Sequence, residues 1–124
     1  MMNDLYISEN FKLSEFESPD TKEVKIDEKL IDKLEKYRKK VGNIPIRINS
    51  GYRTSEHNKA VGGASKSLHM TGKACDIHKL KDYSIEEMAY LAEQIGFAGI
   101  GKYNWGIHVD VRGYKARWDD RGQE

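Results

Sequence analysis

Three residues in the second half of the sequence, His69, Asp76 and His108, have side chains of the types that bind transition metals. Two neutral imidazoles and one carboxylate suit zinc, and three protein ligands leave a fourth position for water, as in catalytic zinc sites. Zinc in such a site would activate that water and polarise a peptide carbonyl. Histidines on polar strand faces are often only hydrogen-bonded surface residues, so the spacing alone leaves both interpretations open.

The segment that contains His108 is expected to be a β-strand over Ile107–Arg112. Because side chains alternate between the two faces of a strand, its apolar residues would pack on the core. His108, Asp110 and Arg112 would then share the opposite face. Such a row of charged and imidazole groups beside a buried sheet is costly unless the groups are paired or bind something.

The segment that contains Asp76 is expected to be a second strand, Ala74–His78, with the same alternation. Asp76 and His78 would project from one face and the apolar residues from the other. Gly72 would allow the chain to turn between His69 and this strand. Two strands thus each present imidazole and carboxylate groups on a polar face.

The remaining sequence predicts three helices and two further strands around these two. Asp27 is a plausible N-cap for the first helix, and Ser84 with Glu87 forms a capping box for the last one, which Gly96 closes. The expected elements are helices at 27–41, 54–62 and 84–96 and strands at 44–49, 74–78, 99–103 and 107–112. This order predicts the α+β class, with a small antiparallel sheet flanked by helices.

The composition of the 124-residue chain is that of one globular domain, 1–124. Lys plus Arg is 21 and Asp plus Glu is 20, so the net charge of +1 gives no reason to expect nucleic-acid binding. The single cysteine, Cys75, excludes an intrachain disulfide. No apolar run suggests a signal peptide or a membrane span, so we expect a chain that is cytoplasmic when synthesised, without membrane insertion, and monomeric.

Several blocks of the sequence resemble a known family when they are taken in order. Ser67–Asp76 has the pattern S-x-H-x-x-G-x-A-x-D, and H-x-D follows at His108. These blocks resemble the D-Ala-D-Ala carboxypeptidase family of zinc metallopeptidases, which includes carboxypeptidases, D,D-dipeptidases and phage L-alanyl-D-glutamate endopeptidases. The resemblance is closest to its short single-domain branch from phages and bacteria. Further blocks that fit are Phe11–Phe16, Ile46–Arg53, Glu56–Ala64, His108–Gly113 and Ala116–Trp118.

The resemblance implies a zinc ion held by His69, Asp76 and His108, in a fold of the Hedgehog/DD-peptidase type. It implies hydrolysis of a peptide bond in the stem peptides of peptidoglycan, by a D,D-carboxypeptidase or an endopeptidase. A phage endolysin or a host enzyme of wall remodelling would both fit, with delivery by lysis, a holin or a phage particle. The alternative is a non-catalytic, zinc-stabilised module of a phage particle or wall-binding assembly. A weaker alternative is a peptidase that acts on other peptides.

The sequence departs from the family pattern at Trp105. Many members carry an acidic catalytic residue three positions before the last ligand histidine, and an indole at that position cannot accept a proton. The nearest carboxylate is Asp110, on the expected strand face of His108. Asp110 is therefore a hypothesis for the general base and acid, and the competing interpretation is that it only orients a ligand histidine.

Two further residues are expected to serve the substrate. By resemblance, Arg53 in the S-G-Y-R block binds a substrate carboxylate or oxyanion, for which a guanidinium offers two parallel donors; the alternative is a structural ion pair. Ser67 would bind the substrate or the backbone, or simply cap a local turn. His57 is expected to be structural. His78 is expected to stay outside the metal site, because a fourth protein ligand would close it.

Overall fold

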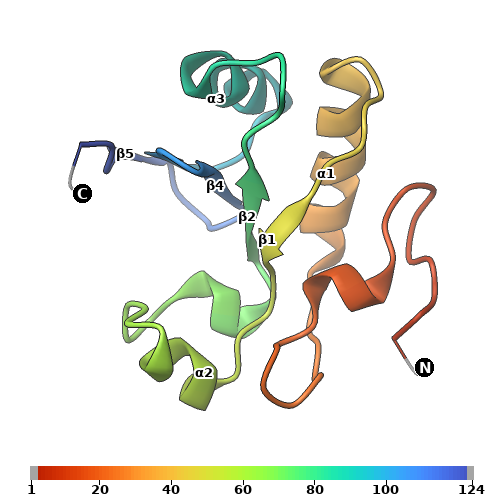
Figure 1. Ribbon diagram of the computed structural model, residues 1–124, viewed down its shortest axis with the longest axis vertical. Helices are drawn as coiled ribbons and strands as arrows, with labels where there is room; N and C mark the ends of the chain where they lie inside the picture. Colours follow the sequence, from red (N-terminus) through yellow and green to blue (C-terminus); the bar gives the residue numbers. More distant parts are fainter. Residues whose placement is uncertain (1–2, 123–124) are drawn as a thin grey trace.

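The computed structural model describes residues 3–122, which build one sheet with two helices against it (Figure 1). Helices α1 (Glu28–Lys40) and α3 (Ile85–Ile95) pack on the same face of this sheet, and the short helix α2 (Ser55–Ala60) lies below it. The α+β class is therefore confirmed. Within the described residues, no helix has both the length and the apolar character that crossing a bilayer requires.

The sheet has five strands in the order β1 (Ile48–Ser50), β2 (Ala74–His78), β4 (Gly106–Asp110), β3 (Gly99–Tyr103) and β5 (Ala116–Asp119). The neighbours are antiparallel except for β3 and β5, which are parallel. The expectation of an antiparallel sheet was therefore only partly right, since the sheet is mixed. The Hedgehog/DD-peptidase type stays a prediction.

Strand β5 is parallel to β3 because the chain crosses over after β4 before it joins the edge of the sheet. Backbone hydrogen bonds of 2.9 Å join Ala116 N to the Ala98 carbonyl and Asp120 N to the Lys102 carbonyl. Arg117 strengthens this edge by donating from Nη1 to the same Ala98 carbonyl at 2.5 Å. The C-terminal segment is thus held firmly beside the polar face of the sheet.

The helix ends follow the capping residues expected from the sequence. Asp27 caps α1 by accepting a hydrogen bond from Lys29 N at 2.8 Å, and Thr54 caps α2. Ser84 and Glu87 form the reciprocal capping box of α3. Each such cap satisfies backbone donors that a helix start leaves free, which is worth about 1 kcal/mol.

Two strands, β1 and β4, have bounds that differ from the expectation. The first strand begins at Ile48 rather than at 44, because Pro45 lacks the backbone N–H that a ladder needs. Strand β4 covers Gly106–Asp110, so Val111 and Arg112 lie beyond its end. The expected alternation nevertheless holds, and Ile107 and Val109 are fully buried on the helix side.

The core lies between the sheet and the two long helices. Its side chains come from α1, α3 and the inner strands, and the Tyr37 hydroxyl donates to the Met88 carbonyl at 3.0 Å across the helix pair. Burying each large apolar side chain contributes about 1.5–3 kcal/mol. Because this face of the sheet is filled by the helices, the opposite face is left for polar side chains.

Candidate metal centre

The three expected metal ligands come from three different elements that meet on the polar face. Asp76 on β2 lies directly opposite His108 on β4 in the antiparallel register. His69 belongs to a 3₁₀ helix, Leu68–Thr71, which ends at Gly72 in a left-handed conformation with φ of 75°. A side chain at Gly72 would also collide with the backbone of Lys25, so the glycine permits the tight return from His69 to β2.

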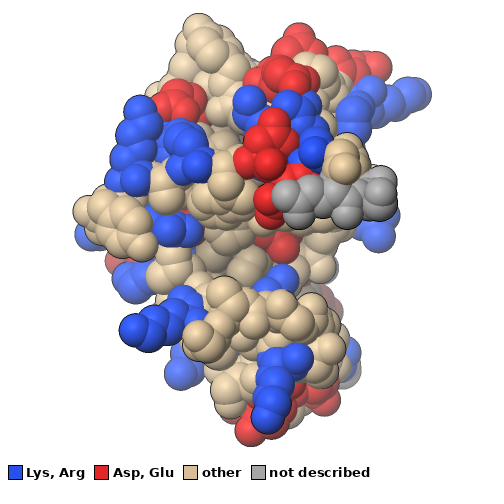
Figure 2. All heavy atoms as spheres, turned by 90° about the vertical axis from the view of Figure 1, so that its left-hand side faces the viewer, with Lys and Arg blue, Asp and Glu red and all other residues tan. Residues whose placement is uncertain are grey.

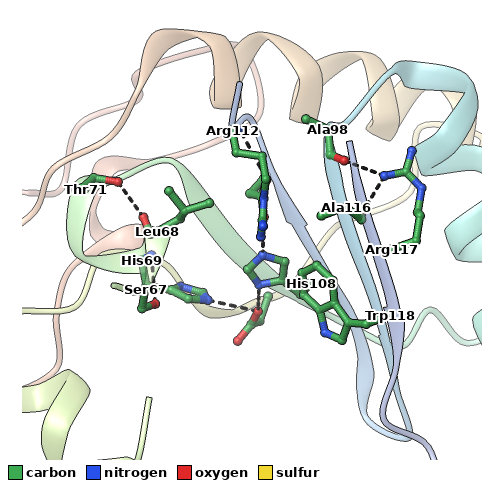
Figure 3. A network of polar contacts seen from close by, with 12 residues as sticks. Ser67, Leu68, His69, Thr71, Ala98, His108, Arg112, Ala116, Arg117 and Trp118 are labelled. Carbon is green, nitrogen blue, oxygen red and sulfur yellow. Dashed lines mark hydrogen bonds and ion pairs between the residues drawn. The ribbon is translucent and has the colours of Figure 1, made fainter. Parts of the chain in front are cut away.

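The ligand atoms of His69, Asp76 and His108 lie within 4.8 Å of one another. Oδ1 of Asp76 is 3.3 Å from Nε2 of His69 and 3.1 Å from Nδ1 of His108. All three side chains are buried. Figure 3 shows the two imidazoles directed towards a common point from opposite elements.

Each histidine uses its other ring nitrogen for a bond to a group that can only accept. Nδ1 of His69 lies 2.8 Å from the Gly51 carbonyl, and Nε2 of His108 lies 2.7 Å from Oδ2 of Asp110. These outer nitrogens must therefore carry the hydrogen in the neutral imidazoles. The two inner nitrogens then present lone pairs to a carboxylate oxygen, an arrangement that a cation between them would satisfy.

The electrostatics of the centre favour an ionised Asp76. Burial would raise the pKa of this carboxyl, but the ring nitrogens of His108 and His69, which can donate to it when the imidazoles are protonated and no cation lies between them, outweigh burial and hold it well below its usual value. Burial likewise opposes charge on His108, whereas its hydrogen bonds with Asp110 and Asp76 raise its pKa. The donor set is thus a carboxylate anion flanked by two imidazoles.

The centre opens on a cleft of about 770 Å³. Figure 2 looks onto the side of the molecule where α2 and β5 lie, and the surface is hollowed between these two parts, with Lys and Arg side chains on both sides. Among the described residues that line this cleft, Asp76 is the only acid, and the bases are Arg53, Lys66, Lys73 and Arg112. The cleft can therefore expose one face of a bound metal to a ligand that carries negative charge.

The sequence comparisons agree with this geometry. The family model described as Peptidase M15 matches residues 9–111, which is most of the chain. This chain belongs to the Peptidase M15 family. A segment of 45 residues is 47% identical to the zinc D-Ala-D-Ala carboxypeptidase of Streptomyces albus G. That segment is 36% of this chain and covers 18% of the relative, so the chain spans only a small part of that curated protein's length.

Membership of the M15 peptidase family and the geometry of the centre together confirm the expected zinc cofactor. The donor set of His69, Asp76 and His108 is compatible with zinc, and a homologous protein is named for that metal. The atoms that would hold the ion are Nε2 of His69, a carboxylate oxygen of Asp76 and Nδ1 of His108.

Asp110 lies behind His108 rather than on the cleft of this M15 domain. Its side chain is fully buried, it accepts from His108, and Arg112 donates to both of its oxygens, with Nε 2.9 Å from Oδ1 and Nη2 2.7 Å from Oδ2. In Figure 3 the Arg112 side chain points down towards the imidazole of His108. These bonds lower the pKa of Asp110 in spite of its burial.

Arg53 lies on the cleft beside the metal ligands. Its Nη2 is 3.5 Å from Oδ2 of Asp76, while Nε donates to Ser50 Oγ at 3.1 Å and Nη1 to Asn58 Oδ1 at 3.2 Å. Its backbone N–H donates to the His69 carbonyl at 3.0 Å. The guanidinium is therefore fixed at the edge of the centre, where a substrate could reach it.

The other polar residues singled out in the sequence take different places. Ser67 lines the cleft and accepts from the backbone N–H of His69 at 3.2 Å, so it caps the 3₁₀ helix. His78 is exposed and is not part of the ligand group among the described residues. His57 lies on α2, outside the residues that line the cleft.

The sequence reasoning missed the part that Trp118 plays in the site. In the sheet register, Ser50, Asp76, His108, Gly101 and Trp118 form one row across the five strands. A side chain at Gly101 would overlap the indole of Trp118, which lies across this glycine with its ring centroid 5.0 Å from that of His108. Glycine on the polar face of a predicted strand was the available signal of such a close approach.

Proposed function

We propose that this protein hydrolyses a peptide bond in the stem peptides of peptidoglycan, with zinc held by His69, Asp76 and His108. The observation that carries the proposal is the convergence of two imidazole nitrogens and one carboxylate oxygen beside an open cleft. Membership of the M15 peptidase family supports the reaction type. The name of the Streptomyces albus G relative supports a D-Ala-D-Ala peptide as the kind of substrate.

The bound zinc would supply Lewis acidity, which activates water and polarises the carbonyl of the scissile bond. The chain's own residues would orient the reactants. Arg53 would donate two parallel hydrogen bonds to a substrate carboxylate or to the carbonyl oxygen as it gains negative charge. Ser67 would hold the 3₁₀ helix of His69 in place and offer its hydroxyl to the peptide backbone.

We further propose that Asp110 is a positioning residue. Its burial and its bonds to His108 and Arg112 support the interpretation that it fixes the imidazole with Nδ1 towards the metal. A direct role in moving a proton would require Asp110 to reach the cleft, from which the His108 ring separates it. The proton-shuttle hypothesis is therefore the less favoured of the two.

The cationic lining of the cleft supports an anionic peptide as the substrate. Lys73 is paired with Asp27 at 2.8 Å and Arg112 with Asp110, whereas Lys66 is exposed at the rim. Stem peptides carry free carboxylates, which Lys66 and Arg53 would attract. Cleavage at the end of the stem or inside it would both satisfy this complementarity.

A digestion of purified peptidoglycan tests the proposal. The zinc-loaded protein is expected to release products that mass spectrometry identifies as D-alanine or as shortened stem peptides, and a chelator should stop their release. A His69→Ala variant should be inactive, while the matched His78→Ala variant, with a change on the exposed face of β2, should cleave normally. The masses of the products would identify the bond.

The second candidate is a zinc-stabilised module without catalysis. Trp105 at the position of the usual acid and the burial of Asp110 away from the cleft are the observations that favour it. A protein that retains stoichiometric zinc but cleaves no muropeptide at any pH would support this candidate and contradict the enzyme.

A further inference from the structure

The phenol of Tyr103, at the end of β3, is held from two sides within the cleft. Nε1 of Trp118 donates a hydrogen bond to its oxygen at 2.7 Å. The ring of Trp105 stacks on the Tyr103 ring with centroids 4.7 Å apart and planes 16° apart. A side chain with only two rotatable bonds that is fixed in this way has little freedom to lose when a substrate binds.

The hydrogen of the Tyr103 hydroxyl is directed away from Trp118. An indole N–H can only donate, so the phenol oxygen is the acceptor in that bond and its own hydrogen must point elsewhere. Tyr103 lines the same cleft as Asp76 and His108. The negative charge of Asp120 also lies close enough to influence the phenol, and its carboxylate is an acceptor to which the hydroxyl can turn while the cleft is empty.

The phenol stays protonated at neutral pH. Burial raises the pKa of Tyr103 above its usual value, the Trp118 N–H opposes this, and the charges of Asp120 and Asp76 add to the rise. A neutral phenol of this kind serves as a hydrogen-bond donor rather than as a base.

Tyr103 and Arg53 lie on opposite sides of the metal ligands. The ligand-bearing strands β2 and β4 are the second and third in the strand order, with β1 on one side and β3 on the other. Arg53 follows β1 and is fixed beside Asp76, whereas Tyr103 ends β3 on the same face as His108. The two donors therefore flank the place where a carbonyl bound to this centre would lie.

We propose that Tyr103 donates a hydrogen bond to the carbonyl oxygen of the scissile peptide bond, opposite Arg53, and so stabilises the negative charge that develops there. The inference deepens the proposed peptidase function and rests on it. No proton leaves the phenol in this role. Trp118 and Trp105 act as positioning residues, because they fix the phenol without contacting the reacting atoms.

Tyr103→Phe is the sharpest test, because it removes one oxygen and keeps the ring that stacks on Trp105. We expect kcat on purified wall peptides to fall about 10²-fold, as for the loss of one donor to a developing oxyanion. The KM, the zinc Kd and the melting temperature should stay close to those of the wild type. Tyr6→Phe, on an exposed tyrosine near the N-terminus, is the matched control.

A binding measurement supplies a readout that does not depend on turnover. A phosphinate peptide imitates the tetrahedral carbon and its charged oxygens, so calorimetry should show its affinity falling in Tyr103→Phe about as much as kcat. A methylene analogue, in which CH₂ replaces the phosphinate group and no charged oxygen remains, should bind both proteins equally. Equal binding of the phosphinate by wild type and variant would overturn the role of Tyr103 even if the wild type itself proved inactive on wall peptides.

The remaining outcomes separate the two proposals. If the wild type binds the phosphinate more tightly than Tyr103→Phe does but cleaves no wall peptide, the role of Tyr103 stands and only the proposal of wall-peptidase activity fails. If the wild type is active and Tyr103→Phe has the same kcat as Tyr6→Phe, the proposed donor role of Tyr103 is overturned. The hydroxyl would then bond only to Asp120. A variant that loses zinc affinity or unfolds also overturns it, because Tyr103 would then be part of the scaffold.

Discussion

Asp110 and His108 lie two residues apart on the same face of β4, with Oδ2 of Asp110 2.7 Å from Nε2 of His108. The carboxylate therefore holds the hydrogen on the nitrogen that is remote from Asp76 and leaves Nδ1 as the ligand atom. Gly99, opposite Asp110 in the register, makes room for that carboxylate, since a side chain there would overlap it. The orientation of one metal ligand thus depends on a buried acid and on a glycine in the neighbouring strand.

Replacing Asp110 by Asn should weaken zinc binding more than it impairs the zinc-loaded enzyme. We expect the zinc Kd to rise about 10–100-fold, as for other groups that orient a ligand histidine. At saturating zinc, kcat should stay within a few-fold of the wild type. Competition titration with a chelating dye measures the zinc Kd, and muropeptide release measures kcat. The exposed Asp119→Asn variant is the control. A collapse of kcat with unchanged zinc affinity would restore Asp110 as a proton shuttle.

Zinc should stabilise the fold through its three ligands. With free zinc at 100 times its Kd, the gain is about 2.7 kcal/mol, visible as a higher melting temperature in calorimetry. His69→Ala should abolish this zinc-dependent rise, whereas His78→Ala should keep it in full, since that imidazole is exposed and outside the ligand group. A melting temperature that is indifferent to zinc in the wild type would contradict the metal site.

Adding one methyl group at Gly99 should disturb the centre from the neighbouring strand. In Gly99→Ala the new Cβ would overlap the Asp110 carboxylate, so the side chain must move away from His108. We expect a loss of about 1–3 kcal/mol in the free energy of unfolding, together with weaker zinc binding. Gly113→Ala has open space around its new Cβ and should be close to neutral. Denaturant unfolding and zinc titration of both variants make the comparison.

Acid should loosen the N-terminal segment through Glu35 on α1. This carboxylate accepts from Ser8 Oγ at 2.5 Å and from Asn10 N and Nδ2 at 2.7 Å. Partial burial would raise its pKa, but these bonds outweigh burial and lower it. The folded pKa therefore lies below the unfolded value of about 4.3, so the stabilisation is present above that value and is lost as the pH falls through the folded pKa.

The Glu35→Gln variant removes that charge and should lose about 1–2 kcal/mol near pH 7, the scale of hydrogen bonds to a charged group. Its free energy of unfolding should also decline less steeply below pH 4.5 than that of the wild type. Urea unfolding at several pH values measures both, and the exposed Glu9→Gln is the control. Parallel acid profiles for wild type and Glu35→Gln would show that this carboxylate carries none of the acid sensitivity.

Strands β2 and β4 could be predicted from the sequence because each alternates apolar and polar residues. The same alternation placed Asp76 and His108 on the polar face, which the structure confirms. The register that sets these two residues opposite each other could not be predicted, because it depends on strands that are far apart in the sequence. Spacing alone therefore left the metal site as one of two interpretations, and the resemblance to a family supplied the choice.

Strand β5 escaped prediction for a different reason. Its four residues, Ala116–Asp119, do alternate between apolar and polar types, but four residues are the shortest run on which alternation can indicate a strand. Pairing with β3 defines it, and Trp118 faces the site only because Gly101 lets the indole lie across the sheet. Both facts are tertiary, so the C-terminal wall of the cleft could be described only from the fold.

The row of residues from Ser50 to Trp118 has a consequence for a chain that is still being synthesised. When β2 has left the ribosome, His69 and Asp76 are available but His108 is still to come, and Trp118 follows ten residues later. Two ligands without the third give a much weaker site, and ion binding is coupled to completion of the sheet. The growing polypeptide should therefore take up its ion only after the strand that carries His108 has been translated, which delays any metal-dependent activity until this sheet is complete.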